Sequence, residues 1–475
     1  MAAIRRKCDN IVFISGNTLA VLDFRTRVLQ FLQVPTIEEQ NPQDEEEEGK
    51  KDKEESLNTA TDNTILASAF SPSGLYFAVC DNQKQLHLFA TEPEWTLTDT
   101  RSLSRRCTSI VFTKDDTTVI VGDKCGDVYS IKVSDWEKPA QLCLGHLSIL
   151  LDVVLVHNDQ YIVTCDRDEK IRISHFPNAY NIHSFCLGHT EFVSSLVYAK
   201  DDDLLISGSG DCSVRVWCLD GKERCCIKSH ICSQSPAEGQ PSDLEENTQS
   251  SDLQRNTQST DLEGNTQSSD LQGNAQSSDL QGNVQSSDLE GNVQSSDLQG
   301  NAGLTEQPAI EKIVYNNKHK LLAVSVSRQA RVEMYQLQVS DSSVSLTLLQ
   351  TLTFNTDPWD IVFDDHDLLW VLLPVEDALL KVFELKEDKE NHCITVSEVC
   401  DNSAVEACKQ TMNKHWTFFK VSLEKPSVLP SLWKQRIDNV SDYLLRKQQR
   451  LKGDANGEEL CKVKTLIPEK KLKAS

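Results

Sequence analysis

Two copies of one sequence unit stand head to tail near the middle of the chain. Each copy begins with Leu-Gly-His, and the two histidines, His146 and His189, lie 43 residues apart. Each histidine precedes an aspartate by 22 residues, Asp168 in the first copy and Asp211 in the second. A fixed period of this length means that the chain repeats one supersecondary unit, which buries its apolar face against the next copy.

Gly-His at one end of the unit and a Trp-ended run (Ser213–Trp217) at the other resemble the WD-repeat signature, whose unit is a four-stranded propeller blade. Runs rich in Val, Ile, Leu, Phe and Thr recur along the chain between Asp, Asn, Gly and Ser turns, as strands do. We therefore expect an all-β, seven-bladed WD-repeat β-propeller with disordered loop inserts and a short C-terminal helix. The expected blades contain Ile11–Val34, Ile65–Ala90, Cys107–Val133, Leu150–Phe176, Phe192–Ile227, Ile310–Leu349 and Pro358–Leu385.

Ring closure needs one further expectation, because an open array of blades would expose strand edges. We expect a last strand pair from Trp416–Leu423, and pairing of the N-terminal strands with the C-terminal ones. The propeller would then consist of residues 8–35, 63–232 and 309–433.

The net charge of −24 is concentrated in two segments. Segment 36–62 carries −8, segment 233–308 carries −12, and both are polar and poor in aromatic residues. Such composition predicts an acidic disordered loop and a disordered insert. The acidity of the whole chain therefore says little about the surface of the folded part.

The insert is a tandem nonapeptide in which Asp-Leu begins seven copies, at positions 243, 252, 261, 270, 279, 288 and 297. One leucine in nine residues cannot bury enough apolar surface to offset chain ordering. A calcium-binding nonapeptide roll needs two glycines beside each aspartate, and each copy here has at most one. We interpret the segment as an expanded repeat within a loop.

The C-terminal part reverses the sign of the charge, with +5 over residues 434–475. Apolar residues near a 3.6 period predict a basic amphipathic helix over 434–452, followed by a disordered basic tail over 453–475. Its cationic face includes Arg446, Lys447 and Arg450, which are candidates for contact with RNA or with a partner protein.

Sixteen cysteines are scattered without a C-x-x-C pair, which favours reduced thiols in a nuclear or cytosolic protein. Cys80, Cys165 and Cys186 fall within apolar runs and are expected in the core. We expect no metal site, no secretion signal and no membrane span.

The residues that look most chemical are interpreted as structural. A histidine, an aspartate, a strand hydroxyl and a tryptophan form a buried hydrogen-bonded tetrad in WD blades, where each polar group needs a partner. The histidine and aspartate could also be read as a catalytic dyad, but the repeat context favours the structural role. The expected members are His189, Ser207, Asp211 and Trp217 in one blade, and His146, Thr164 and Asp168 in the preceding blade.

No enzyme motif is present in the sequence: there is no phosphate-binding Gly loop, no dinucleotide fingerprint and no nucleophile elbow. We therefore expect a non-enzyme without a cofactor or a small-molecule substrate of its own.

The repeat register places several charged residues at one end of two neighbouring blades. The entry loop of a blade and the turn between its second and third strands share one end, because the strands are antiparallel. Arg105 and Arg106 lie in such an entry loop, and Lys124, Arg167 and Lys170 lie in or beside such turns. Any one of them could be an ordinary solvated turn residue, but five on one edge predict a binding surface.

Several strings go beyond a generic WD repeat. They include Leu144–Ser148, Asp166–Arg172 and Ser184–Val193, with smaller pieces at Arg105–Thr108 and Asp438–Ser441. The chain resembles the WD-repeat, non-catalytic subunit of the eukaryotic tRNA (guanine-7-)-methyltransferase. The match is strongest over residues 64–230.

This resemblance implies a scaffold that binds and stabilises a separate methyltransferase, which uses S-adenosylmethionine and makes 7-methylguanosine in the tRNA variable loop. It implies a heterodimer in the nucleus, with the cytoplasm left open as a second location, that meets tRNA through the complex. The positions that dock the catalytic subunit in the family match Arg105, Lys124, Arg167, Glu169, Lys170 and Arg172. The alternative is a substrate receptor or adaptor of a ubiquitin ligase, which the fold alone permits.

Overall fold

The computed structural model describes residues 2–36, 63–229, 307–340, 342–388, 393–424 and 427–434. The chain divides into two units, residues 1–233 with 303–475, and residues 234–302, and all of the described residues belong to the first unit. The acidic loop from residue 37 on, the nonapeptide insert, and the basic helix and tail beyond Lys434 lie outside the described residues, and so do Arg446, Lys447 and Arg450.

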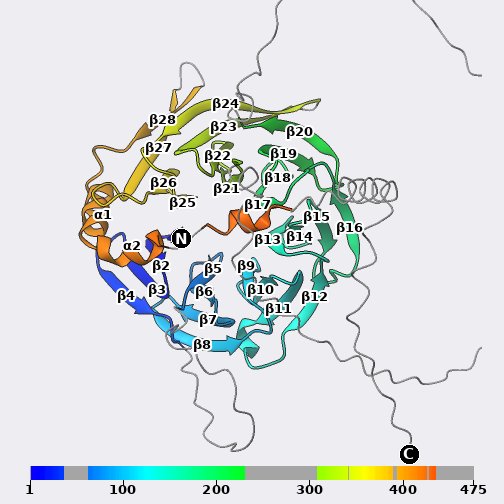
Figure 1. Ribbon diagram of the computed structural model, residues 1–475, viewed down its shortest axis with the longest axis horizontal. Coiled ribbons are helices and arrows are strands. Elements are labelled where there is room, and N and C mark those ends of the chain that lie inside the picture. The colour runs from blue at the N-terminus through cyan, green and yellow to red at the C-terminus, as the bar shows by residue number, and fades with distance from the viewer. Residues whose placement is uncertain are drawn as a thin grey trace, which may run out of the picture. The chain divides into compact units, whose positions relative to one another are not determined.

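Seven four-stranded antiparallel sheets surround a central axis, so the expected seven-bladed β-propeller is confirmed (Figure 1). Each sheet is built from four strands consecutive in sequence. Blade 1 contains β1 (Ala3–Lys7), β2 (Asn10–Ser15), β3 (Thr18–Asp23) and β4 (Leu29–Gln33); blade 2 contains β5 (Ile65–Phe70), β6 (Tyr76–Asp81), β7 (Gln85–Ala90) and β8 (Thr96–Ser102); blade 3 contains β9 (Cys107–Phe112), β10 (Thr118–Asp123), β11 (Asp127–Lys132) and β12 (Gln141–Gly145), with the short 3-10 helix η1 (Val133–Asp135).

The remaining blades follow the same order. Blade 4 contains β13 (Leu150–Val156), β14 (Tyr161–Asp166), β15 (Ile171–His175) and β16 (Ile182–Cys186); blade 5 contains β17 (Val193–Ala199), β18 (Leu204–Ser209), β19 (Ser213–Cys218) and β20 (Glu223–Lys228); blade 6 contains β21 (Ile310–Asn316), β22 (Leu321–Val326), β23 (Arg331–Val339) and β24 (Val344–Thr353); blade 7 contains β25 (Asp360–Phe363), β26 (Leu368–Leu372), β27 (Leu380–Asp388) and β28 (Cys393–Glu398).

Burial follows the position of a strand within its blade. All six residues of β18 are buried, whereas the outermost strand of the same blade, β20, alternates between exposed and half-buried positions. The apolar clusters span neighbouring blades, because each sheet must cover its faces with the next sheet. Cys80, Cys165 and Cys186 belong to these clusters, and burial raises the pKa of the Cys186 thiol to about 12.

The expected closure by mixed pairing of N- and C-terminal strands is wrong. The N-terminal segment supplies all four strands of blade 1, beginning at Ala3, earlier than the expected boundary at residue 8. Blade 7 obtains its fourth strand from β28, which the sequence patterns did not predict. The ring is closed by contacts between two complete blades: the Ile4 backbone N–H donates to Asp360 at 3.0 Å, and Arg5 pairs with the same carboxylate at 2.7 Å.

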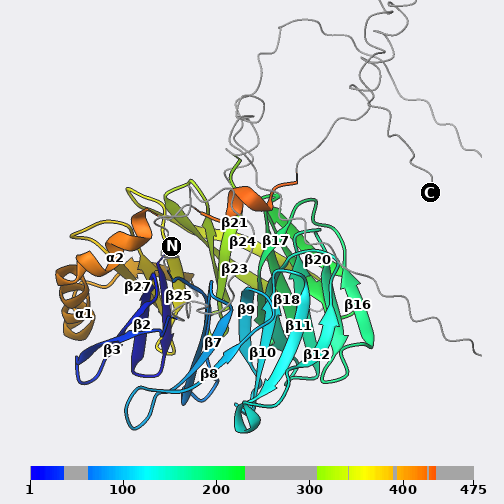
Figure 2. The same cartoon turned by 60° about the horizontal axis from the view of Figure 1, so that its bottom comes forward.

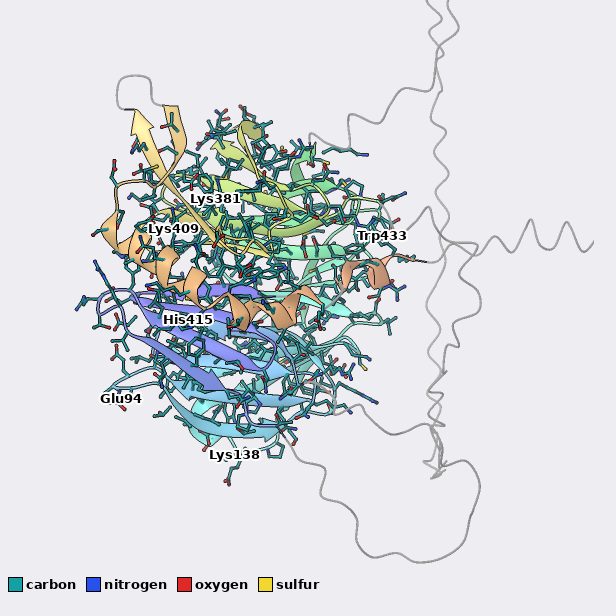
Figure 3. The ribbon with its side chains drawn as sticks, turned by 60° about the vertical axis from the view of Figure 1, so that its left-hand side comes forward. Glu94, Lys138, Lys381, Lys409, His415 and Trp433 are labelled. Atoms are coloured by element: carbon teal, nitrogen blue, oxygen red, sulfur yellow. The ribbon has the colours of Figure 1, made fainter. Side chains whose placement is uncertain are left out.

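The expected strand pair at Trp416–Leu423 is also wrong, because this segment is helix α2 (Trp416–Leu423) and follows helix α1 (Ser403–Lys414). Asn402 caps α1, accepting hydrogen bonds from the backbone of Ala404 and Val405. Aromatic residues at a spacing of three, Trp416 and Phe419, give α2 one buried face, and tertiary packing overrides their strand preference. Figure 3 shows both helices, with Lys409 and His415 labelled, lying between blades 7 and 1.

Candidate partner-binding surface

Blade 5 contains a complete hydrogen-bonded tetrad. His189 Nδ1 lies 3.0 Å from Asp211 Oδ2, and His189 Nε2 lies 2.8 Å from Ser207 Oγ. The indole Nε1–H of Trp217 donates to the same Ser207 hydroxyl at 2.8 Å. Burial alone would raise the pKa of Asp211, but the hydrogen bond and charge of His189 hold that pKa well below its ordinary value. The four side chains brace the blade interior.

Blade 4 departs from this arrangement, and the prediction of Asp168 as a tetrad member is wrong. His146 Nδ1 lies 2.9 Å from Asp166 Oδ2, and its Nε2 lies 2.7 Å from Thr164 Oγ1. Asp166, at the end of β14, also accepts hydrogen bonds from the backbone N–H groups of Asp168 and Lys170 through its second oxygen. One carboxylate thus holds both the histidine and the turn, and the Asp168 side chain stays 40% exposed.

A third histidine network, in blade 2, was not predicted from the sequence because it lacks a Gly-His start. His87 on β7 lies 3.2 Å from Asp81 and 3.0 Å from Thr100. Asp81 ends the second strand of its blade, as Asp123 and Asp166 end theirs. An aspartate at this repeated position was the signal that could have revealed the network.

We use the term entry end for the end of a blade where its first strand starts. We use the term charged edge for the following seven residues: Arg105, Arg106, Lys124, Arg167, Glu169, Lys170 and Arg172. In blade 3 the Lys124 backbone N–H donates to the Arg106 carbonyl at 3.0 Å, so the entry loop and the second turn do meet. In blade 4 the Arg167 backbone N–H reaches the carbonyl of Ile149 in the same way, at 2.9 Å. Ser109 of blade 3 donates to Asp152 of blade 4 at 3.0 Å, so the two blades are neighbours.

The members of the charged edge differ in exposure. Arg105, Arg106, Lys124 and Lys170 are exposed, and the Arg106 Nε–H donates to the Asn82 carbonyl of blade 2 at 3.2 Å. Arg172 is half-buried, lies on β15 and donates to the Gly145 carbonyl at 3.0 Å, and burial lowers the pKa of its guanidinium. Arg172 therefore connects two strands of neighbouring blades and is a poor candidate for a purely surface role.

The sequence patterns did not predict that the chain's own C-terminal segment, residues 427–434, reaches the charged edge. The Nε–H of Arg167 donates to the Leu432 carbonyl at 3.0 Å, and the Lys434 ammonium bonds to the Glu169 carboxylate and lies 3.6 Å from Asp168. Figure 2 shows the short 3-10 helix η2 (Leu429–Leu432) of this segment lying on one face of the ring.

Apolar contacts fix the C-terminal segment in place. Leu432 packs with Phe192 and Ala309, and the Trp433 ring lies edge-on to the Phe192 ring with centroids 5.2 Å apart. The hydrogen bond that the Lys434 ammonium donates to the Glu169 carboxylate raises the pKa of Lys434. The segment thus covers part of the charged edge in blade 4 and leaves the blade 3 part uncovered.

In the part of the chain that the structure describes, no group of three or more His, Cys, Asp or Glu side chains is placed to hold a metal ion. None of the helices in those residues is long and apolar enough to cross a membrane.

Seven blades with a His-Asp-Ser-Trp tetrad define the class of the protein as a WD-repeat propeller. The family described as tRNA methyltransferase TRM82 WD40 domain matches residues 33–141 and 132–245. The relative named tRNA (guanine-N(7)-)-methyltransferase non-catalytic subunit wdr4, from Danio rerio, is 33% identical over 95% of this chain and 92% of the relative. The proteins of that name from Mus musculus and Homo sapiens are 31% and 30% identical, over 86% and 80% of this chain and 80% and 75% of the relatives.

The chain therefore belongs to the family of WD-repeat, non-catalytic subunits of tRNA (guanine-N7)-methyltransferase.

Proposed function

We propose that this chain binds a separate methyltransferase subunit through the charged edge and supports formation of 7-methylguanosine in tRNA without catalytic groups of its own. The names of its relatives describe a non-catalytic subunit, which implies a catalytic partner. S-adenosylmethionine binding then belongs to the partner, tRNA is met through the heterodimer, and the complex acts in the nucleus.

One observation carries the docking site: among the described residues, three exposed cations of the charged edge form no ion pair. Arg105, Lys124 and Lys170 are exposed, and within the described residues they form no ion pair. Arginine and lysine side chains arranged in this way suit carboxylates on a partner surface. Asp168 and Glu169 stand among them, and such a mixture of signs suits a protein better than a phosphate backbone.

Lys434 indicates how the acidic members of the charged edge could be used. Its ammonium contacts Glu169 and Asp168 from within the same chain, in the way that a lysine of a partner could. Arg446, Lys447 and Arg450 lie outside the described residues, and their contact with the partner or with tRNA stays a prediction from the sequence.

Charge reversal of the exposed cations tests the proposal directly. The triple variant R105E/K124E/K170E is expected to reduce co-purification with the catalytic subunit at least tenfold, because three attractive contacts become repulsive. Arg172 is left unchanged, since its contact with Gly145 makes it part of the fold. The matched control K132E/K200E/K420E changes the charge equally at exposed lysines outside the charged edge and is expected to bind normally.

Two further readouts complete the experiment. Circular dichroism melting establishes that both triple variants are folded, and a 7-methylguanosine assay compares the catalytic subunit with and without this chain. Full co-purification of R105E/K124E/K170E would remove the docking site from consideration. Stoichiometric recovery of a ubiquitin-ligase scaffold from cell extract, in place of a methyltransferase, would favour the alternative function.

A further inference from the structure

A cavity of about 400 Å³ opens at the entry end of blades 6 and 7, away from the charged edge. Its walls come from the start of β21, from the loops leading into β25 and β23, and from the C-terminal segment 427–434. The lining residues that matter for its chemistry are Glu311, Arg328, Thr356, Asp357, Trp359 and Trp433. Five wall residues (Gln307, Arg328, Asp357, Ser427 and Pro430) are exposed, so the cavity is open to solvent.

A β-bulge positions the carboxylate of this cavity. The register of β21 with β22 shifts between Ile310 and Lys312, so Glu311 stands outside the strand ladder. Bulges of this kind change the direction of a side chain, and they are frequent next to active sites. The corresponding bulges at the starts of β5, β9, β13 and β17 place Leu66, Thr108, Leu151 and Ser194 at this position. Blade 6 therefore carries a charge where four other blades carry an apolar or hydroxyl side chain.

The Glu311 carboxylate is poorly compensated. Among the described residues it forms no ion pair or side-chain hydrogen bond, because the neighbouring Lys312 ammonium bonds to Asp360 instead. Burial, together with the charges of Asp360 and Asp357, raises the pKa of Glu311 to about 7. The Thr356 hydroxyl, also in the wall, is buried without a hydrogen-bond partner in the described structure. A cation that entered the cavity would satisfy both groups.

Two indole rings stand in the walls of the same cavity, and both are held by aromatic neighbours. The Trp359 ring stacks on Trp416 and Phe419 of α2, with centroids 6.3 Å and 6.1 Å away. The Trp433 ring packs edge-on against Phe192. Indole faces attract ammonium and guanidinium groups, most strongly where water is excluded. Rigid rings in the same lining as the Glu311 carboxylate form a preorganised environment for a cation.

We propose that this cavity binds a lysine or arginine side chain presented by another polypeptide. Its volume suits one long side chain, its indoles suit the aliphatic stem and the cation, and Glu311 supplies the countercharge, with Asp357 in the same lining. The cavity opens at the same end of the blades as the charged edge, so a protein lying on that face could reach it. The inference does not depend on the proposed function, since it concerns this chain alone.

Peptide binding to the purified full-length chain tests the proposal. The probes are the acetylated, amidated pentapeptides Gly-Ser-Arg-Ser-Gly and Gly-Ser-Lys-Ser-Gly, and the matched neutral peptide carries citrulline in place of arginine. Because two tryptophans line the cavity, intrinsic fluorescence reports occupancy. We expect saturable changes with the arginine and lysine peptides, and at least tenfold weaker binding of the citrulline peptide. Equal binding of the arginine and citrulline peptides would overturn the proposal, and so would the absence of a saturable change.

Variants locate the binding. E311Q is expected to weaken binding of the arginine peptide at least tenfold, and W433A is expected to weaken it several-fold. The control E376Q removes an exposed charge from the neighbouring β26–β27 loop and should leave the affinity for the peptide unchanged. Melting curves verify folding, and W433A provides an independent test because Trp433 lies on the peripheral C-terminal segment. Unchanged binding by E311Q would place the peptide elsewhere.

A last variant separates an external polypeptide from the chain's own basic tail. If Arg446, Lys447 or Arg450 already filled the cavity, R446S/K447S/R450S would bind the arginine peptide more tightly than the unmodified chain. Affinity unchanged by this variant assigns the cavity to another polypeptide. A several-fold increase would overturn that part of the proposal.

Discussion

The sequence repeats that form blades 4 and 5 both start with Leu-Gly-His, but the two blades use their aspartates in different ways. In blade 5, Asp211 lies in the second turn and is bonded to His189, so the turn is part of the internal bracing. In blade 4, the bracing carboxylate is Asp166, two residues earlier in the repeat register, and Asp168 is released to the surface. Because the bracing hydrogen bond lies two positions earlier in blade 4, the side chain of Asp168 stays exposed for the partner contact that we propose.

The largest expected effect comes from breaking the blade 5 network. D211A leaves His189 Nδ1 and the Thr190 backbone N–H without their carboxylate, so we expect a loss of about 3 kcal/mol in the free energy of unfolding. Urea unfolding measures this loss. The matched change in blade 4, D168A, should alter stability by no more than about 0.5 kcal/mol. Equal losses in the two variants would contradict the distinction between the turns.

Because of the same carboxylate, we expect the free energy of unfolding to depend on pH. The pKa of Asp211 is lowered in the folded state, so its stabilisation is present above the ordinary aspartate pKa and is lost as the pH falls through the acid range. D211A should therefore lose part of the acid sensitivity of the unmodified chain. Unfolding curves between pH 7 and pH 3 would show the difference.

The second prediction moves the disruption to blade 4. D166A removes the partner of His146 and the cap of the β14–β15 turn, and we expect a loss of about 2 kcal/mol. Because the same turn carries Glu169 and Lys170, this variant should also weaken co-purification with the catalytic subunit. A D166A chain of normal stability would mean that His146 needs no carboxylate.

The third prediction contrasts these paired carboxylates with Glu311, which forms no ion pair among the described residues, and the expected change of stability with pH has the opposite sign. The folded-state pKa of Glu311 is raised to about 7, so the folded chain binds an additional proton between pH 4.5 and 7 and loses stability as the pH rises through that window. E311Q removes this cost and should stabilise the chain by about 1 kcal/mol at pH 8, with less effect at pH 5. Thermal unfolding at the two pH values distinguishes this from a uniform shift.

The smallest effect concerns the contact between the C-terminal segment and blade 4. The Lys434–Glu169 pair is more than a third exposed on the lysine side, so K434A should cost no more than about 0.5 kcal/mol. The measurable change should be local, in the fluorescence of the nearby Trp433. A global loss of stability in K434A would show that the segment is a structural part of the ring.

The repeat period made the propeller predictable, because residues 43 positions apart are expected at the same strand or turn of successive blades and at the same end of each blade. It also placed Lys124 beside the blade 3 entry loop. The period could not predict which aspartate reaches His146, since that depends on side-chain reach and on the turn that Asp166 caps. The position of a residue in the repeat predicts its backbone environment well, but it predicts the hydrogen-bond partner of its side chain less well.

The errors near the C-terminus have a different cause. Trp416–Leu423 is rich in residues that favour strands, and only its packing against Trp359 and Phe13 makes it a helix. The contact of Leu432 with Arg167 joins residues 265 apart in sequence, and no local pattern encodes it. Elements outside the repeat have no internal template, so their structure follows from tertiary contacts.

The seam between blades 1 and 7 has a consequence for how the ring opens. A ring closed by a shared strand cannot open without breaking a backbone ladder, whereas here all seven sheets would survive separation at the seam. The joint depends on ion pairs, among them Arg5–Asp360 and the buried Arg6–Asp364, and on the helices α1 and α2 packed across it. Amide hydrogen exchange should therefore be fastest, among the inner strands, in β1 and β25, and should rise there with ionic strength as the more exposed Lys7–Asp365 pair is screened.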